Sequence, residues 1–145
     1  MSKLPAPLGA SALLALLIVA LGAPDQALGA DTDWSKAETV TVKLTDFEFS
    51  PAYLRFHAGA PVRLVIVNEG TGGHDFSAPE FFSAVTYGPG GSAPAEGAIE
   101  VAKNETKEVD LLPVAAGSYK LKCRHFMHNM FGMHGVIEVV GGQAQ

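Results

Sequence analysis

Residues 123–135 read CRHFMHNMFGMHG and contain the only cysteine of the chain, three of its five histidines and every methionine except the initiator. Thiolate sulfur, imidazole nitrogen and thioether sulfur are soft to borderline ligands, which suit copper or zinc far better than calcium or magnesium. The spacing from Cys123 to His128 is C-x4-H, and the spacing from His128 to Met133 is H-x4-M. The stretch is therefore a candidate metal-binding loop that offers three ligands.

A fourth ligand has to come from another part of the chain. His74 follows the apolar pattern VIVN and the glycine-rich segment EGTGG, where glycine lets the backbone pass close to a site. Zinc favours four strong ligands, or three and a water. Two histidines, one cysteine and a weak axial methionine are instead the blue-copper set. We therefore predict one copper ion bound by His74, Cys123, His128 and Met133.

Other histidines compete for two of these positions. His125 stands two residues after the cysteine and competes with His128, although the loop is expected to turn away there. His134 competes with Met133, but an imidazole would bind too strongly for a weak axial bond. For His74 the alternative is an ordinary loop histidine, and we expect His57, beside the AGA turn, to be a solvated surface residue.

The remaining loop side chains also have two interpretations. Met127 and Met130 either attract Cu(I) as a thioether cluster or give the site an apolar cover together with Phe126 and Phe131. Methionine is a common filler of apolar gaps, which favours the cover.

The N-terminal 30 residues have the three-part form of a secretory signal peptide. Lys3 precedes an apolar run over residues 12–21, and a stretch of small residues ends at Ala30, after which we expect cleavage. An uncleaved anchor is the alternative, but the run is shorter than the ~20 apolar residues that a spanning helix needs. The sequence thus predicts a periplasmic or secreted protein.

The remaining chain predicts one domain with an acidic surface. Residues 31–37 would form a lead-in, residues 38–140 a copper-binding domain, and residues 141–145 a disordered tail. The formal net charge is −5 and stays so without residues 1–30, which contain one lysine and one aspartate. This charge disfavours nucleic acid or an anionic membrane surface as a partner. Nothing in the mature sequence is apolar and long enough to span a bilayer.

A single cysteine in an exported protein needs an explanation, because an unpaired thiol outside the cytosol is prone to oxidation. Cys123 could be a buried inert thiol, one half of an intermolecular disulfide, or a thiolate held by a metal. The histidine and methionine spacing favours the metal.

Short strands dominate the pattern of the mature chain. Period-two alternation or short apolar runs predict strands over residues 38–44, 53–57, 61–68, 98–103, 107–112, 118–123 and 135–140. Residues 78–85 could form one or two helical turns, and residues 86–97 are rich in Gly, Pro and Ala and indicate a loop. Seven or eight strands with little helix predict an all-β Greek-key sandwich. Its expected core is Phe47, Phe49, Phe56, Val62, Leu64, Ile66, Val101, Val109, Leu111, Leu121, Ile137 and Val139.

Three segments of the sequence resemble the cupredoxins, the blue copper proteins that include plastocyanin, pseudoazurin, azurin and auracyanin. They are FEFSPAYLRFHAGAPVRLVIVNEG (47–70), NEGTGGHDF (68–76), and GSYKLKCRHFMHNMFGMHGVIEV (117–139), which has the family's G-x-Y-x-x-x-C, His and M-x-G pattern. The resemblance implies the same four ligands, a type 1 copper and one-electron transfer. Two features depart from the common pattern. The ligand loop has the longer auracyanin-type spacing, and Asp75 replaces an asparagine, which would lower the redox potential.

The function predicted from the sequence is an exported one-electron carrier, expected to be a monomer that docks briefly with redox partner proteins near His128. The alternative is a copper-binding protein for sequestration, tolerance or delivery to an oxidase. A third possibility is a binding module with an inert cysteine. We find no nucleophile with an adjacent base and no paired carboxylates, so an enzyme is not expected.

Overall fold

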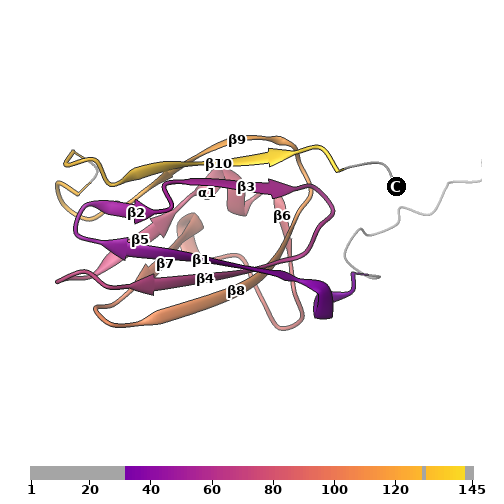
Figure 1. Ribbon diagram of the computed structural model, residues 1–145, viewed down its shortest axis with the longest axis horizontal. Helices are drawn as coiled ribbons and strands as arrows, with labels where there is room; N and C mark the ends of the chain where they lie inside the picture. Colours follow the sequence, from indigo (N-terminus) through magenta and orange to yellow (C-terminus); the bar gives the residue numbers. More distant parts are fainter. Residues whose placement is uncertain (1–31, 129, 143–145) are drawn as a thin grey trace, which may run out of the picture.

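The computed structural model describes residues 32–128 and 130–142 of the chain. Two five-stranded sheets face each other as a sandwich (Figure 1). The first sheet has the order β2-β1-β4-β8-β6 and consists of β1 (Glu38–Thr45), β2 (Glu48–Ser50), β4 (Val62–Asn68), β8 (Thr106–Pro113) and β6 (Val85–Tyr87). The second has the order β3-β10-β9-β5-β7 and consists of β3 (Tyr53–His57), β10 (His134–Val140), β9 (Gly117–Lys122), β5 (His74–Ser77) and β7 (Ala98–Val101). The all-β sandwich predicted from the sequence is confirmed.

Helical structure is limited to short turns in the described residues. The 3-10 turns η1 (Trp34–Lys36) and η2 (Ala95–Gly97) accompany one α-helical turn, α1 (Pro79–Phe82). Pro79 suits the first position of α1 because the backbone N–H that it lacks would be unpaired there. No helix in the described part of the chain is long and apolar enough to cross a membrane.

The alternation of side chains explains the two layers. Val42 and Leu44 of β1 point into the sandwich and are fully buried, while Lys43 between them is exposed. β4 alternates in the same way and lies between β1 and β8, as its nearly continuous apolar sequence predicted. The buried apolar side chains form one cluster that includes Phe49, Leu54, Phe56, Leu64, Ile66, Phe76, Phe81, Leu111, Leu121 and Ile137.

Two of the twelve predicted core residues differ from expectation. Val109 is only partly buried against the cluster. Phe47 was wrongly placed in the core, because its side chain is 40% exposed. Phe47 lies in the turn between β1 and β2 with a φ of 72°, and this turn directs its ring toward His128 and Phe131.

The three strands that the sequence did not predict are short. β2 and β6 have three residues each, too few for a visible alternation, and β6 shows that part of the predicted loop over residues 86–97 is an edge strand. β5 has four residues that are all buried, three of them polar, so it has neither an apolar run nor a period of two. The seven predicted strands are present, with ends that differ by at most two residues.

Strand register brings distant ligand candidates together. β5 is antiparallel to β9, with Ser77 opposite Lys122. Moving back along β5 to His74 therefore leads toward the residues that follow Lys122, which begin with Cys123. His74, the first residue of β5, and Cys123, the residue after β9, thus meet at one end of the sandwich. The loop from β9 to β10 lies at the same end (Figure 1).

Candidate metal centre

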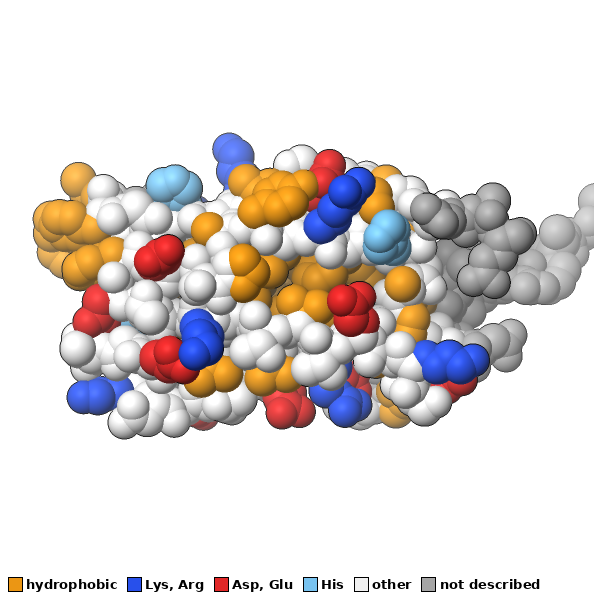
Figure 2. Space-filling view, in the orientation of Figure 1, with side chains coloured by type: hydrophobic (Ala, Val, Ile, Leu, Met, Phe, Trp, Pro, Cys, Tyr) orange, Lys and Arg blue, Asp and Glu red, His pale blue; other side chains and the backbone are white. Residues whose placement is uncertain are grey.

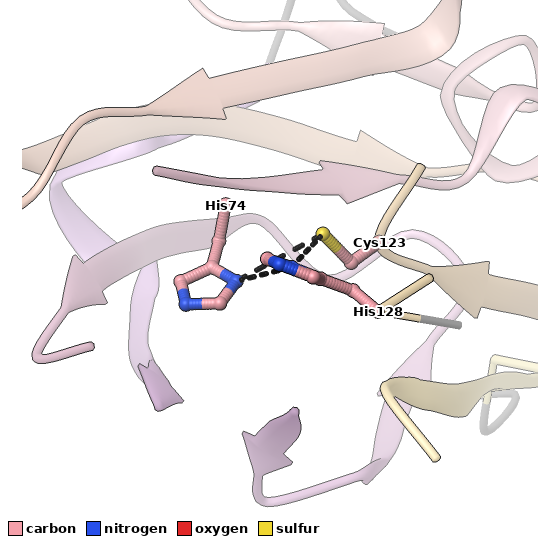
Figure 3. Close-up of side chains that lie close together, drawn as sticks. All are labelled: His74, Cys123 and His128. Carbon is pink, nitrogen blue, oxygen red and sulfur yellow. Dashed lines mark hydrogen bonds between the residues drawn. The ribbon is translucent and has the colours of Figure 1, made fainter. Parts of the chain in front are cut away.

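Three of the four predicted ligands converge (Figure 3). The Sγ atom of Cys123 lies 3.9 Å from Nδ1 of His74 and 3.5 Å from Nδ1 of His128. The two Nδ1 atoms are 3.1 Å apart. This is the one group of at least three His, Cys, Asp or Glu side chains with metal-site spacing that is found among residues 32–128 and 130–142.

The triangle of donor atoms fits a metal ion. The point equidistant from the three atoms lies about 2 Å from each, as follows from the three distances. Metal–nitrogen bonds of ~2.0 Å and metal–sulfur bonds of ~2.3 Å are typical of such ligands. Two imidazole nitrogens and one thiol would each present a lone pair to that point, so the donor set has the size and the softness that copper requires.

His74 is held in the orientation that this geometry needs. Its side chain is fully buried, and its Nε2 lies 3.2 Å from Oδ1 of Asp46. A carboxylate at this distance accepts a hydrogen bond from Nε2–H, and in that tautomer Nδ1 is the nitrogen with a free lone pair. Thr71 fixes the carboxylate in turn, because its backbone N–H and its hydroxyl both donate to Asp46.

The β4–β5 loop that carries His74 is tied down by Asn68. This buried side chain donates from Nδ2 to the carbonyl oxygens of Gly72 and Val101, and its Oδ1 accepts the N–H of Gly70. Gly70 is packed so closely that a Cβ atom there would lie 2.5 Å from Nε2 of His74. Asn68, six residues before His74, therefore fixes the loop, and Gly70 leaves room for the His74 ring.

Cys123 is fully buried, and it is a free thiol. Burial raises the pKa of this thiol, while the backbone N–H groups of Asp75 and His125 act in the opposite direction by stabilising the thiolate. The Asp75 N–H lies 3.5 Å from Sγ. A metal at the site would replace the thiol proton and remove the unfavourable effect of burial.

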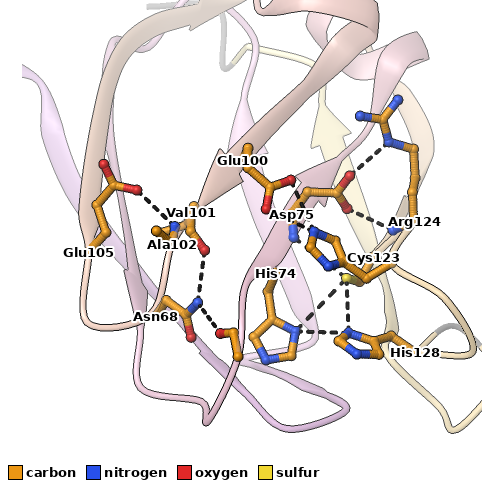
Figure 4. A network of polar contacts seen from close by, with 12 residues as sticks. Asn68, His74, Asp75, Glu100, Val101, Ala102, Glu105, Cys123, Arg124 and His128 are labelled. Carbon is orange, nitrogen blue, oxygen red and sulfur yellow. Dashed lines mark hydrogen bonds and ion pairs between the residues drawn. The ribbon is translucent and has the colours of Figure 1, made fainter.

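A partly buried ion pair joins β5 to the residue that follows the thiol (Figure 4). The Asp75 carboxylate is 2% exposed and accepts hydrogen bonds of 2.7 Å from both the backbone N–H and the Nε of Arg124. Arg124 also reaches Glu96 at 3.0 Å. The charge of Asp75 is thus paired, so its lowering effect on a redox potential is smaller than the sequence alone suggested.

His128 is the partly exposed member of the group. Burial and the neighbouring His74 lower its pKa, which favours the neutral imidazole that ligates a metal. Its ring packs edge-on against Phe47 at 5.1 Å and lies nearly parallel to His125 at 5.5 Å. Its carbonyl accepts the N–H groups of Phe131 and Met133, which closes the loop tightly around it.

Met133 and His134 are placed very differently. Met133 is fully buried, and its carbonyl accepts the backbone N–H of Cys123 at 3.1 Å, so the two residues are adjacent across the base of the loop. His134 is exposed at the start of β10. These positions support Met133 over His134 as the axial ligand, which stays a prediction.

His125 lies outside the converging group. Its Nε2 contacts the Glu100 carboxylate at 2.8 and 3.0 Å, and its side chain is 33% exposed. In the competition between His125 and His128, His128 is thus the histidine that joins His74 and Cys123. His57, also expected on the surface, is exposed.

Large apolar side chains surround the site at the surface. Phe126 is 88% exposed and Met130 79%, with Phe131, Met127 and Phe47 exposed to lesser degrees. Figure 2 shows hydrophobic side chains gathered at the end of the molecule where the β9–β10 loop lies. We call these five residues the apolar rim. Phe126 and Met130 cover little, because they point largely into solvent.

Sequence reasoning missed Asp46 and Glu100, the carboxylates that hold His74 and His125. They stand 28 and 25 residues from their partners, in strands or turns of ordinary composition, so no local motif marks them. The ion pair between Arg124 and Asp75 was also not predicted. The available signal was that an arginine follows Cys123 and an aspartate follows His74, so two proposed ligands each have a charged neighbour of opposite sign.

Comparisons with known proteins agree with the fold. Residues 11–139 match the family described as Cupredoxin-like domain, so the chain belongs to the cupredoxin-like family. No curated protein sequence matches it significantly. The dithionite-reduced auracyanin of the photosynthetic bacterium Roseiflexus castenholzii is similar in structure, with a TM-score of 0.55 and 15% identity over 72% of this chain and 98% of that one.

Two further solved structures show the same fold. Auracyanin B has a TM-score of 0.55 and 23% identity, over 72% of this chain and 90% of that chain. A multicopper oxidase from Campylobacter jejuni has a TM-score of 0.54 and 16% identity, over 70% of this chain but only 30% of the oxidase. The fold therefore occurs both as a whole protein and as part of a larger enzyme.

Proposed function

We propose that this protein is an exported mononuclear copper protein that carries single electrons. The observation that supports this most strongly is the convergence of two Nδ1 atoms and one Sγ atom around a point about 2 Å from each, in a cupredoxin-like fold. His74, Cys123, His128 and Met133 would hold one type 1 copper. Bound there, copper supplies a centre that cycles between Cu(I) and Cu(II).

The surroundings of the site suit rapid electron transfer because they resist movement. His74, Cys123 and Met133 are fully buried. Asp46 holds the His74 ring. The backbone N–H groups of Phe131 and Met133 donate to the His128 carbonyl and so hold the loop that carries His128. Ligands fixed in this way keep nearly the same positions in both oxidation states, which lowers the reorganisation that accompanies each transfer.

His128 is the proposed port for electrons. It is the only one of the four ligand candidates with solvent exposure, and Phe47 of the apolar rim packs against its ring. Contact there would be brief and small, in the class below ~1,200 Å² that is common for redox encounters. We propose that redox partner proteins dock at this end, that the protein is a monomer, and that it works in the periplasm or outside the cell.

Export is proposed from the sequence alone. The predicted signal peptide, residues 1–30, lies outside the described residues, as do residues 143–145 of the predicted tail. The absence of enzymatic activity also stays a prediction, since part of a multicopper oxidase has a similar fold.

Reductive titration of the copper-loaded protein tests electron transfer. We expect one electron per copper to bleach the Cu(II) form, and reoxidation to restore the full absorbance without loss of metal. Release of copper on reduction, or a requirement for two electrons, would contradict a one-electron carrier.

The alternative function is copper sequestration or delivery, and the position of His125 favours it. An imidazole and a carboxylate stand beside the site on its exposed side, and two methionines of the apolar rim are exposed. Rapid transfer of copper from the loaded protein to a chelator, faster than electron exchange between its two oxidation states, would support delivery over electron transport.

A further inference from the structure

Within the described part of the chain, the proposed copper site meets solvent through one of its four proposed ligands. His74, Cys123 and Met133 are fully buried, whereas His128 is partly exposed. An ion from solvent must therefore pass along the His128 ring before it meets the other three side chains.

The rings that neighbour His128 differ chemically. The Phe47 ring lies 5.1 Å from the His128 ring and 5.1 Å from the Phe131 ring between centroids, and these phenyl rings offer no ligand atom. The His125 ring lies nearly parallel to His128, with 5.5 Å between centroids, and its centroid is 6.4 Å from that of His74. Among the described residues, His125 is the one histidine outside the converging group whose ring neighbours both ligand imidazoles.

His125 also has a carboxylate partner that is open to solvent. Its Nε2 lies 2.8 Å from Oε1 of Glu100, a side chain that is 61% exposed. Gly73 brings backbone against both groups, since a Cβ there would lie 3.3 Å from each. In the β5–β7 register Glu100 stands opposite Asp75, whose charge is paired with Arg124. Among residues 32–128 and 130–142, His125 is thus the side chain that pairs with this exposed carboxylate.

We propose that His125 and Glu100 form a loading site that receives Cu(II) from solvent and passes it to the buried ligands. This inference rests on the proposed copper-binding function. Imidazole nitrogen and carboxylate oxygen together are suitable ligands for Cu(II). Bonds from the ion to His125 and Glu100 break as bonds to His74, Cys123 and His128 form. The Sγ–H bond of Cys123 breaks, its proton goes to water, and the ion keeps its oxidation state.

A loading site makes a kinetic prediction that separates it from a final ligand. Groups that lie on the path, but not in the bound state, change the rates of metal uptake and release by the same factor and leave the equilibrium affinity unchanged. Charged groups at the mouth of a site raise association rates by about 10- to 1,000-fold. We expect His125→Ala and Glu100→Gln each to slow both uptake and release about tenfold.

Stopped-flow spectroscopy measures these rates on the full mature protein. Metal-free protein is mixed with aqueous Cu(II), and the growth of the thiolate charge-transfer band gives the uptake rate. Loaded protein mixed with a chelator gives the release rate. Glu96→Gln is the matched control for charge, because it removes a carboxylate of 81% exposure that contacts Arg124 instead of His125. His134→Ala is the control for loss of an exposed imidazole.

Slower uptake and release in both His125→Ala and Glu100→Gln, with controls within about twofold of the unmodified protein, is the expected result. Unchanged rates in both variants would overturn the loading site alone. Equal slowing in Glu96→Gln would also overturn it, because general charge attraction would then suffice. Failure of the unmodified protein to form any charge-transfer band would instead overturn the proposed copper function, and the loading site with it.

Discussion

Gly70→Ala should weaken copper binding without unfolding the protein. An added Cβ at this position would lie 2.5 Å from Nε2 of His74 and 2.7 Å from Oδ1 of Asp46, whereas ordinary contacts begin near 3.4 Å. The ring and the carboxylate must therefore both move away from the Cβ, by about 0.9 and 0.7 Å, which follows from these distances. Their 3.2 Å contact would open to about 4 Å, beyond hydrogen-bonding range.

Loss of the partner that orients a metal-ligating histidine typically costs about 10- to 100-fold in metal affinity. This corresponds to about 1.4–2.7 kcal/mol of binding free energy. Competition with a chelator of known affinity measures the change. Gly72→Ala is the matched control, because it lies in the same loop and a Cβ there meets nothing within 4 Å. If Gly70→Ala bound copper as tightly as Gly72→Ala, Asp46 would have no part in positioning His74.

Three further results are expected. A hydrogen bond from Arg63 holds the pKa of Asp110 below its ordinary value of 3.8. The stability that this ion pair contributes is therefore fully present above pH 3.8, and it is lost as the pH falls through the lowered pKa. The melting temperature should therefore drop less between pH 6 and pH 3 in Asp110→Asn than in the unmodified protein, and an equal drop would contradict the assignment. Leu64→Ala should lower the free energy of unfolding by about 2–5 kcal/mol in denaturant titrations, since Leu64 is fully buried, and Val114→Ala, at an exposed position, should change it by less than about 0.5 kcal/mol. Phe126→Ala should slow electron exchange with a protein partner and leave the optical spectrum of the copper-loaded protein unchanged, because Phe126 is exposed. An unchanged exchange rate would refute a docking role for Phe126.

The approach of Cys123 to His128 was predictable because their relation is local. Both lie in one stretch between two strands, so residue spacing nearly fixes their geometry, and Met133 in the same stretch stays a predicted ligand. The two sheets were predictable for a similar reason, because alternation along each strand reports which face is buried. His74 required the further step of joining a strand end to a distant loop, and the antiparallel pairing of β5 and β9 provides that link.

The groups around the ligands depend on long-range packing, which sequence does not reveal. Asp46 meets His74 only because the β1–β2 turn lies beside the β4–β5 loop. Phe47 and Phe49 have the i, i+2 spacing of two residues on one face of a strand, but Phe49 is buried while the positive φ of Phe47 turns its ring toward the site. The i, i+2 spacing would place both rings in the core if the strand were continuous. The chain turns at Phe47, so the core prediction holds for Phe49 and is wrong for Phe47.

Optical and paramagnetic spectroscopy of the mature protein loaded with Cu(II) tests the central claim most directly. We predict an intense visible thiolate-to-copper band in the unmodified protein and at equilibrium in His125→Ala, and its loss in Cys123→Ser and His128→Ala. A colourless Cu(II) complex would contradict the type 1 site. Loss of the band in His125→Ala but not in His128→Ala would contradict the choice of ligands.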